Sequence, residues 1–296
     1  MTKTNRRDFL RQASMLVAGG VLGSSFLTSC GGAASSGPKK HIGLQLYSLR
    51  DPISDLGIKR VLELVAEMGY VNLEGANYNR GLFYGEDPVV FKRMVSDLGM
   101  RITSTHLERA LSDDRNADMS WWSTATEACA ATGLKHMVIP MAPLSGEGAT
   151  MDNLLRHADY FNAVGLITAG SSIKLGYHNH AFEFTNTIDG VTVMDLLVEH
   201  TSPRHVSFQN DVNWTQRAGV NPVELLRKYP DRINTLHIKD EKTIGGSGTM
   251  NFKAIFEQAY ANGVVDWYVE VEEYDTTALD DVRKSAEYLI AADYVI

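Results

Sequence analysis

The feature that most constrains the fold is a regular alternation of two kinds of segment from His41 to the end of the chain. Short apolar segments have the length typical of β-strands, and the longer amphipathic segments between them have the 3.6-residue period of α-helices. Three of the predicted helices end in a glycine, which is common at the C-terminus of a helix. The predicted strands are residues 41–48, 71–76, 100–108, 135–141, 172–180, 204–212, 233–240 and 266–272, and the clearest predicted helices are residues 56–69, 87–99, 121–133 and 277–292.

Eight strands that alternate with helices predict an α/β fold of the (β/α)8 TIM barrel type. Residues 41–296 have the size of one such domain, which is typically about 250 residues. An open, doubly wound parallel sheet is the alternative. However, no GxGxxG sequence follows the first predicted strand, and this glycine fingerprint is typical of dinucleotide-binding folds of that kind. We therefore predict a single TIM-barrel catalytic domain over residues 41–296.

The N-terminal segment, residues 1–30, has the layout of an export signal. Arg6 and Arg7 precede an apolar stretch at residues 15–27, an arrangement that resembles a Tat signal. The sequence LTSC, which ends at Cys30, resembles a bacterial lipobox. A plain signal peptide with an incidental cysteine is the alternative. We predict a Tat-type lipoprotein signal peptide (1–30), a flexible tether (31–40) and an exported protein anchored at the periplasmic face through lipid on Cys30.

Charge and cysteine content exclude several classes of site. Residues 1–40 contain six basic residues and one acidic residue, so residues 41–296 carry a net charge of −13 within a total of −8. A domain this acidic repels nucleic acid. Cys129 is the one cysteine after Cys30, which excludes a disulfide within the domain and a zinc site built from several thiolates.

Ionisable side chains concentrate on one face of five predicted strands. Alternate residues of a barrel strand point to the interior, and active sites of such barrels lie at the C-terminal ends of the strands. Buried carboxylates without a positive partner would be very costly, so these side chains predict a bound metal ion. A polar core with satisfied histidines is the alternative. The residues that the alternation places inward are Glu74, His178, His180, Asp211, His237, Lys239, Glu270 and Glu272.

Carboxylate and imidazole groups form the predicted metal site. A mixed oxygen and nitrogen site suits Mn²⁺, Zn²⁺, Co²⁺, Fe²⁺ or Mg²⁺. Such a metal polarises a substrate carbonyl and stabilises the enediolate that forms when a neighbouring proton leaves. The predicted ligands are His178, Asp211, His237 and Glu270, and the predicted catalytic residues are Glu74 and Glu270 as bases and Lys239 as oxyanion stabiliser.

Three further side chains are predicted to bind substrate. His106 ends the third predicted strand, and a place in a polar core is its alternative. His180 follows His178 on the inward face of the fifth predicted strand. Trp214 could stack on the face of a sugar ring, with a packing role as its alternative. The predicted substrate is a small carbohydrate.

Four short motifs carry a family resemblance. They are LQLYSLRD (44–51), GYHNHAFEF (176–184), NDVNW (210–214) and LHIKDE (236–241). They resemble the sugar phosphate isomerase/epimerase family, the xylose isomerase-like barrels that include endonuclease IV, inosose dehydratase and the ketose 3-epimerases. The resemblance implies one divalent metal ion at the barrel mouth, with Mn²⁺ the expected metal, and ligands from strands 5 to 8. Asp211, His237 and Glu270 match the last three positions, and Glu272 is the alternative to Glu270.

The chain departs from the ketose epimerases at the fifth predicted strand. Those enzymes usually carry a glutamate there, whereas this strand ends in His178-Asn179-His180. His178 is the predicted substitute ligand, with His180 and Glu183 as alternatives. The loss of one carboxylate disfavours a two-base epimerisation. It favours a one-base reaction such as isomerisation, dehydration or β-elimination beside a ketone.

The predicted function is therefore a metal-dependent sugar or keto-sugar isomerase or epimerase that abstracts a proton next to a carbonyl. The alternatives are a lyase or dehydratase that acts on 3-keto sugars or glycosides, and a sugar-binding lipoprotein without catalytic activity. An endonuclease that acts on abasic DNA is disfavoured by the acidic domain and by the predicted export signal.

Overall fold

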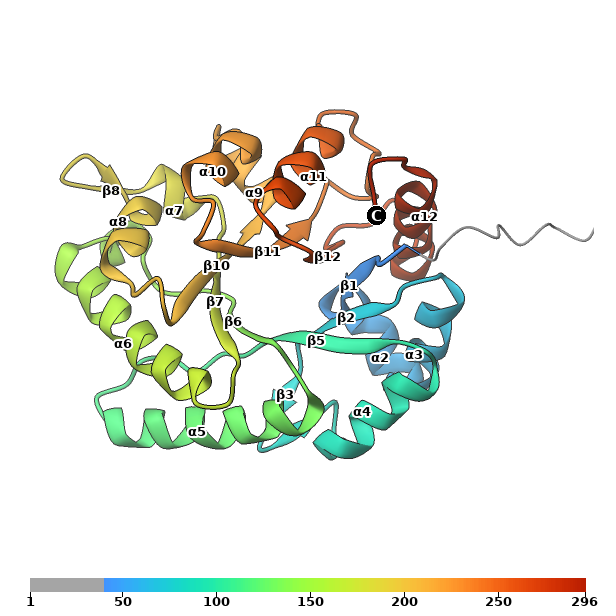
Figure 1. The fold of residues 1–296 in the computed structure, drawn as a ribbon, viewed down its shortest axis with the longest axis horizontal. Coiled ribbons are helices and arrows are strands. Elements are labelled where there is room, and N and C mark those ends of the chain that lie inside the picture. Colours follow the sequence, from blue (N-terminus) through green and yellow to red (C-terminus); the bar gives the residue numbers. More distant parts are fainter. Residues whose placement is uncertain (1–39) are drawn as a thin grey trace, which may run out of the picture. The chain divides into compact units, whose positions relative to one another are not determined.

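The computed structural model of the chain describes residues 40–296 (Figure 1). The predicted signal peptide (1–30) and residues 31–39 of the predicted tether lie outside the described residues, so both stay predictions. Within residues 40–296, none of the helices combines the length and the hydrophobicity that crossing a bilayer requires.

Eight parallel strands close into a barrel, in the order β1-β12-β11-β10-β7-β6-β5-β2. The barrel closes where Leu44 of β1 pairs with Val269 of β12, which confirms the predicted TIM barrel and excludes the open sheet. Each predicted strand contains one observed strand. The strands are β1 (Gly43–Gln45), β2 (Asn72–Gly75), β5 (Arg101–His106), β6 (His136–Ile139), β7 (Lys174–His178), β10 (Val206–Asp211), β11 (Ile233–Ile238) and β12 (Asp266–Val269).

Helices surround the barrel on its outside (Figure 1). The longer ones are α3 (Ile58–Glu67), α4 (Pro88–Asp97), α5 (Arg115–Thr132), α6 (Met151–Ala169), α8 (Val193–His200), α11 (Phe252–Ala261) and α12 (Ala278–Ala291). Shorter elements follow several strands: 3-10 helices η1 (Leu46–Leu49) and η2 (Gly146–Gly148), helices α2 (Arg50–Leu56), α7 (Phe182–Thr185), α9 (Val212–Arg217) and α10 (Pro222–Lys228), and small hairpins β3/β4 (Tyr78–Asn79, Leu82–Phe83) and β8/β9 (Thr187–Ile188, Val191–Thr192).

Helix α5 begins six residues before the predicted start at residue 121. Asp114 caps the helix, because its side chain accepts a hydrogen bond of 2.9 Å from the backbone N–H of Ala117. An N-cap of this kind satisfies one of the free N–H groups of the first turn. The helix start is thus set by a cap that lies before the apolar periodicity begins.

The strands separate an apolar outer face from a polar interior. Outward-facing residues such as Leu175, Phe208 and Leu236 are buried in the hydrophobic core beneath the helices. Inward-facing Thr103 of β5 hydrogen bonds to Asn72 of β2 at 2.6 Å and to the Tyr268 hydroxyl of β12 at 2.7 Å. The barrel interior is therefore a hydrogen-bonded polar network, and the strand alternation follows the inward and outward faces predicted from the sequence.

Candidate metal centre

Four side chains from neighbouring strands converge at the C-terminal end of the barrel. His178 ends β7, Asp211 ends β10, His237 lies in β11 and Glu270 directly follows β12. All four are buried, and each offers one ligand atom within 4.8 Å of the other three. These are the four residues that the sequence predicts as metal ligands, and we call them the four-residue group. The structure brings them together, and metal binding by them stays a prediction.

The chemistry of Asp211 fits a cation. One carboxylate oxygen, Oδ1, accepts a hydrogen bond of 2.8 Å from the backbone N–H of Trp214. The other, Oδ2, is buried and has no hydrogen-bond partner among residues 40–296, and it lies 3.6 Å from Lys239 Nζ and 4.0 Å from His237 Nδ1. A buried carboxylate oxygen without a partner costs free energy, and coordination to a metal ion would satisfy it. Burial and the nearby Glu270 charge outweigh the attraction of Lys239 and raise the pKa of Asp211 to about 6.

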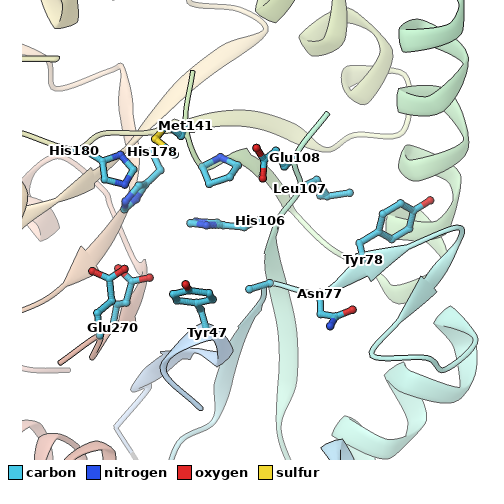
Figure 2. Close-up of a pocket in the computed structure, with 13 residues that line it drawn as sticks. Tyr47, Asn77, Tyr78, His106, Leu107, Glu108, Met141, His178, His180 and Glu270 are labelled. Carbon is cyan, nitrogen blue, oxygen red and sulfur yellow. The ribbon is translucent and has the colours of Figure 1, made fainter. Parts of the chain in front are cut away.

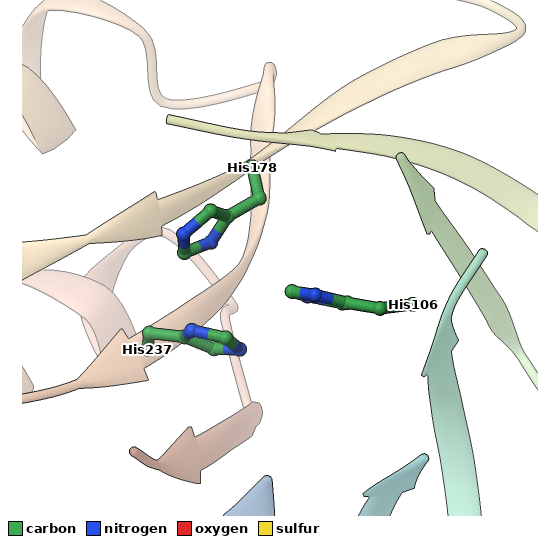
Figure 3. Close-up of side chains that lie close together, drawn as sticks. All are labelled: His106, His178 and His237. Atoms are coloured by element: carbon green, nitrogen blue, oxygen red, sulfur yellow. The ribbon is translucent and has the colours of Figure 1, made fainter. Parts of the chain in front are cut away.

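Gln209 on β10 fixes the hydrogen positions of two histidines. Its Nε2 donates to Glu74 Oε1 at 2.8 Å, so the amide oxygen faces the histidines. That oxygen lies 2.7 Å from His106 Nε2 and 3.2 Å from His178 Nδ1. Because the oxygen can only accept, both ring nitrogens must donate. The Nε2 atom of His178 is then free to bind a metal. The rings of His106, His178 and His237 lie close together (Figure 3), and the three residues form a second possible metal-binding group.

Glu74 lies on the inward face as predicted, but other side chains enclose its carboxylate. It is fully buried and accepts hydrogen bonds from Gln45 Nε2 at 2.8 Å, Ser104 Oγ at 2.5 Å and Gln209 Nε2 at 2.8 Å. His237 Nε2 lies 2.5 Å from its Oε2. Both carboxylate oxygens of Glu74 are already engaged by these neighbours. Such surroundings are those of a group that positions its neighbours. The predicted role of Glu74 as a base stays untested.

His237 lies between two carboxylates. Its Nε2 contacts Glu74, and its Nδ1 lies 3.1 Å from Glu270 Oε2. Burial would lower the pKa of His237, but the charges of Glu270 and Glu74 outweigh it and raise this pKa to about 10. A histidine that donates one ring N–H to a carboxylate presents its other nitrogen to a metal in a fixed orientation. The arrangement therefore fits Glu74 as the partner that orients His237.

Lys239 brings a buried positive charge to the same group. Its Nζ lies 3.0 Å from Glu270 Oε2 and also contacts Glu272. Burial alone would raise the pKa of Glu270, but the charges of His237 and Lys239 hold it well below its usual value. Among residues 40–296, Glu270 and not its alternative Glu272 belongs to the four-residue group. Glu270 is therefore ionised at neutral pH.

A cavity of about 620 Å³ opens beside these residues (Figure 2). Glu270, His178, His106 and His180 line it, so two of the predicted substrate-binding residues face the space a substrate would enter. Burial and the charge of Lys239 lower the pKa of His180 to about 4, which leaves its imidazole neutral at pH 7. The third predicted residue, Trp214, does not line the cavity. Its ring lies 5.7 Å from the ring of His180 and 5.1 Å from Lys239 Nζ, so it supports two of the residues around the site.

Glu183 lies apart from the four-residue group, and its hydrogen bonds fix the conformation of the segment that follows β7. Its carboxylate accepts hydrogen bonds of 2.7 Å from the Tyr177 hydroxyl and 2.7 Å from the backbone N–H of His180. Among residues 40–296, Glu183 belongs to neither possible metal-binding group. The sequence left open whether His178, His180 or Glu183 is the ligand from β7, and the geometry favours His178. Glu183 instead holds the turn that carries His180.

Glu183 gives a testable pH effect on stability. Burial outweighs its hydrogen bonds and raises the pKa of Glu183 from 4.5 to about 7. A carboxyl with a raised pKa in the folded state stabilises the fold fully below pH 4.5, and that contribution is lost as the pH rises through about 7. The loss amounts to roughly 3 kcal/mol. We expect the stability of Glu183→Gln, relative to the unchanged protein, to improve from pH 5 to pH 8 in urea unfolding. A pH-independent difference would contradict the assignment.

Comparison with known proteins agrees with the barrel fold. The sequence profile of the family described as xylose isomerase-like TIM barrel matches residues 62–292. An inosose dehydratase of Geobacillus kaustophilus (strain HTA426) is 24% identical over 257 residues, which cover 73% of this chain and 80% of that protein. A crystal structure of a sugar phosphate isomerase/epimerase from Parabacteroides distasonis ATCC 8503 is 35% identical, with a TM-score of 0.80, and the match covers 87% of this chain and 100% of that chain.

A more distant structure, the IOLI protein with a bound zinc atom, has a TM-score of 0.65 at 14% identity, with 86% of this chain and 99% of that chain covered. At this identity the likeness shows the fold alone. The relatives described above are named as enzymes that act as an isomerase/epimerase or as a dehydratase. They differ in the reaction that their names give.

Proposed function

The chain belongs to the family of xylose isomerase-like TIM barrels, and on that premise we propose that it is a divalent-metal-dependent enzyme that abstracts a proton next to the carbonyl of a keto-sugar. One observation carries the proposal. Among the described residues, Asp211 Oδ2 of the four-residue group has no hydrogen-bond partner, and two members of the group, His178 and Glu270, line a cavity of about 620 Å³. Buried groups of perturbed pKa that converge on a cavity are typical of active sites.

The proposed metal ligands are His178, Asp211, His237 and Glu270. Mn²⁺ is the metal we propose, and Zn²⁺, Co²⁺, Fe²⁺ or Mg²⁺ would also suit these ligand types. A bound divalent cation would supply Lewis acidity, which polarises the substrate carbonyl and stabilises the negative charge that develops on its oxygen.

The remaining chemistry belongs to side chains of this chain. Glu270 lines the cavity and is ionised, so we propose that it takes the proton from the substrate carbon. Lys239 lies 3.0 Å from Glu270 Oε2 and holds this carboxylate in its charged form. A substrate oxyanion would be stabilised by the same ammonium group. His106 and His180 line the cavity and offer ring nitrogens to sugar hydroxyls.

A second candidate reaction is the elimination of water from a keto-sugar. The inosose dehydratases among the relatives support it, as does the histidine at the end of β7, since dehydration needs one base beside the ketone. The two reactions separate in D₂O with inosose, a ketopentose and 3-keto-glucose as substrates. Isomerisation or epimerisation gives a new sugar that carries deuterium, and dehydration gives an unsaturated ketone. Failure of every substrate to exchange or react in the metal-loaded protein would contradict the proposal.

Glu74 is proposed to act through His237 and not on the substrate. Loss of the carboxylate partner of a metal-bound histidine typically weakens metal affinity by about 10–100-fold. We expect Glu74→Gln to weaken Mn²⁺ binding by that amount in a metal-buffered titration, with the circular dichroism spectrum retained. Glu273→Gln, which changes an exposed glutamate after β12, is the control and should bind normally. Unchanged affinity with turnover lost would return Glu74 to the predicted role of base.

We also propose that the protein is exported and anchored to the membrane through lipid on Cys30. The variant Cys30→Ala is expected to move from the membrane fraction to the soluble fraction. Cys129→Ala is the matched control, because Cys129 is a buried free cysteine of α5, and this variant should stay with the membrane. A Cys30→Ala protein that still sediments with membranes would contradict the lipid anchor.

A further inference from the structure

A second cavity, of about 240 Å³, lies beside the substrate cavity at the same end of the barrel. It is formed by the segments after β5 and β6 and by the first part of α6. Glu108 and Met141 line both cavities and form the wall between them. Figure 2 shows both side chains at the edge of the substrate cavity, near His106 and His178. Glu108 is exposed and the Met141 side chain is 53% exposed, and exposed, flexible side chains of this kind can be displaced by a ligand.

The lining of this second cavity suits a ring with an apolar face. Ile139, Ala142 and Phe161 are buried hydrophobic residues that line it. His157 and Tyr160 add two more rings with polar atoms. Ligand pockets typically combine an apolar surface with a few polar groups of this kind, and sugar rings and phenyl rings both present such faces.

The charges around the second cavity leave little net attraction for an anion. Arg109 is engaged by Asp118, with 2.9 Å between Nε and Oδ1. The remaining charged residues of the lining are Arg156 and Glu108, which have opposite signs and are both exposed. The ligand that fits is therefore an uncharged ring.

We infer that the second cavity is a subsite for an uncharged ring attached to the reacting sugar, so that the substrate is a two-ring glycoside. The inference rests on the proposed function, in which the reacting ring lies in the cavity beside the four-residue group. The attached ring, a second sugar or an aromatic aglycone, passes between Glu108 and Met141 and contacts Phe161 and Ile139. A substrate of one ring leaves this subsite empty.

The test compares one-ring and two-ring ligands. Methyl and phenyl glucopyranosides of both anomeric forms are titrated into the full, Mn²⁺-loaded chain by calorimetry. The phenyl form of at least one anomer should bind about tenfold more tightly than its methyl counterpart, which corresponds to about 1.4 kcal/mol. Equal affinities, or no measurable binding of any of the four ligands, would overturn the inference.

Two variants locate the effect. Ala110→Trp places a large side chain at the rim of the second cavity, where Ala110 is exposed, and should abolish the preference for the phenyl form while methyl glycoside binding is retained. Arg156→Ala, at another exposed rim residue, should weaken phenyl glycoside binding and serves if the tryptophan variant fails to fold. Ala131→Trp, at an exposed position of α5, is the control. A preference that persists in both rim variants would contradict the subsite.

These outcomes are distinct from a failure of the proposed function. The binding comparison uses glycosides without a ketone, so it does not depend on turnover. A clear phenyl preference without any proton exchange of keto-sugars would retain the subsite and refute the enzyme. Exchange without the preference would retain the enzyme and refute the subsite.

Discussion

The variant Asp211→Asn is expected to lose the bound metal. The substitution keeps the side chain's shape and an oxygen that can accept from the Trp214 N–H, so the start of α9 should be preserved. It removes the negative charge and replaces the proposed ligand atom Oδ2, which is buried without a hydrogen-bond partner in the part of the chain that the structure describes. Loss of a residue that only hydrogen bonds to a metal ligand weakens metal affinity by about 10–100-fold. Asp211 is itself a proposed ligand, so its loss should weaken the affinity further. We therefore expect metal affinity to fall by more than about 100-fold and metal-dependent activity to disappear with it.

Asp266→Asn is the matched control, because it also removes the charge of a buried aspartate but at a different place in the barrel. Asp266 is a buried aspartate at the first residue of β12, where Lys135 Nζ lies 3.3 Å from its Oδ2. It lies at the opposite end of the barrel from the four-residue group, so Asp266→Asn should retain full metal content in elemental analysis. An Asp211→Asn protein that keeps about one metal per chain would remove Asp211 from the ligand set.

Glu270→Gln is the variant expected to have the largest effect on turnover. Glu270 is the proposed base, and a positioned general base contributes typically about 10²–10⁴-fold to the rate. The substitution also leaves the Lys239 ammonium without one of its two closest carboxylate partners. We expect kcat to fall by at least about 100-fold, measured as deuterium uptake into a keto-sugar in D₂O.

Glu272→Gln and Glu273→Gln make this result specific. Glu272 contacts Lys239 and lines the cavity, so its variant should show a smaller loss than Glu270→Gln. Glu273 is exposed and lines neither of the two neighbouring cavities, so its variant should exchange at the normal rate. A greater loss in Glu272→Gln than in Glu270→Gln would assign the base to Glu272, and normal exchange in both would place the chemistry elsewhere.

The barrel and the convergence of the four-residue group could be predicted from the sequence, because both follow from short-range patterns. A period of two along each strand assigns His178, Asp211 and His237 to the inward face. A closed parallel barrel then brings the C-terminal ends of β7, β10 and β11 to one place. Neither step needs knowledge of any single long-range contact.

The network behind the group could not be predicted, since it depends on several strands at once. The surroundings of Glu74 are provided by Gln45, Ser104 and Gln209, from β1, β5 and β10. The period of two along β10 places Gln209 on the same inward face as Asp211, but its contact with two histidines depends on the register of β10 against β7. Its position two residues before Asp211, on the same strand face, was the one available signal.

The sequence also did not predict the path of the chain after β7. Strand alternation stops at His178, where β7 ends, so it does not determine the direction of the side chains that follow. The observed turn is fixed by Glu183, which binds Tyr177 on the outer face of the strand and the backbone of His180. These two contacts connect the outer face of β7 with the segment that follows the strand. Strand alternation does not predict contacts of this kind.

The most direct test of the central claim is proton exchange by the full chain before and after removal of its metal. The account predicts about one divalent ion per chain by elemental analysis and deuterium uptake into a keto-sugar from D₂O. It also predicts loss of uptake after chelation and recovery on addition of Mn²⁺ or another ion of the set. A protein that takes up no metal even after reconstitution, or that exchanges equally well without it, would contradict the claim that the four-residue group is a catalytic metal centre.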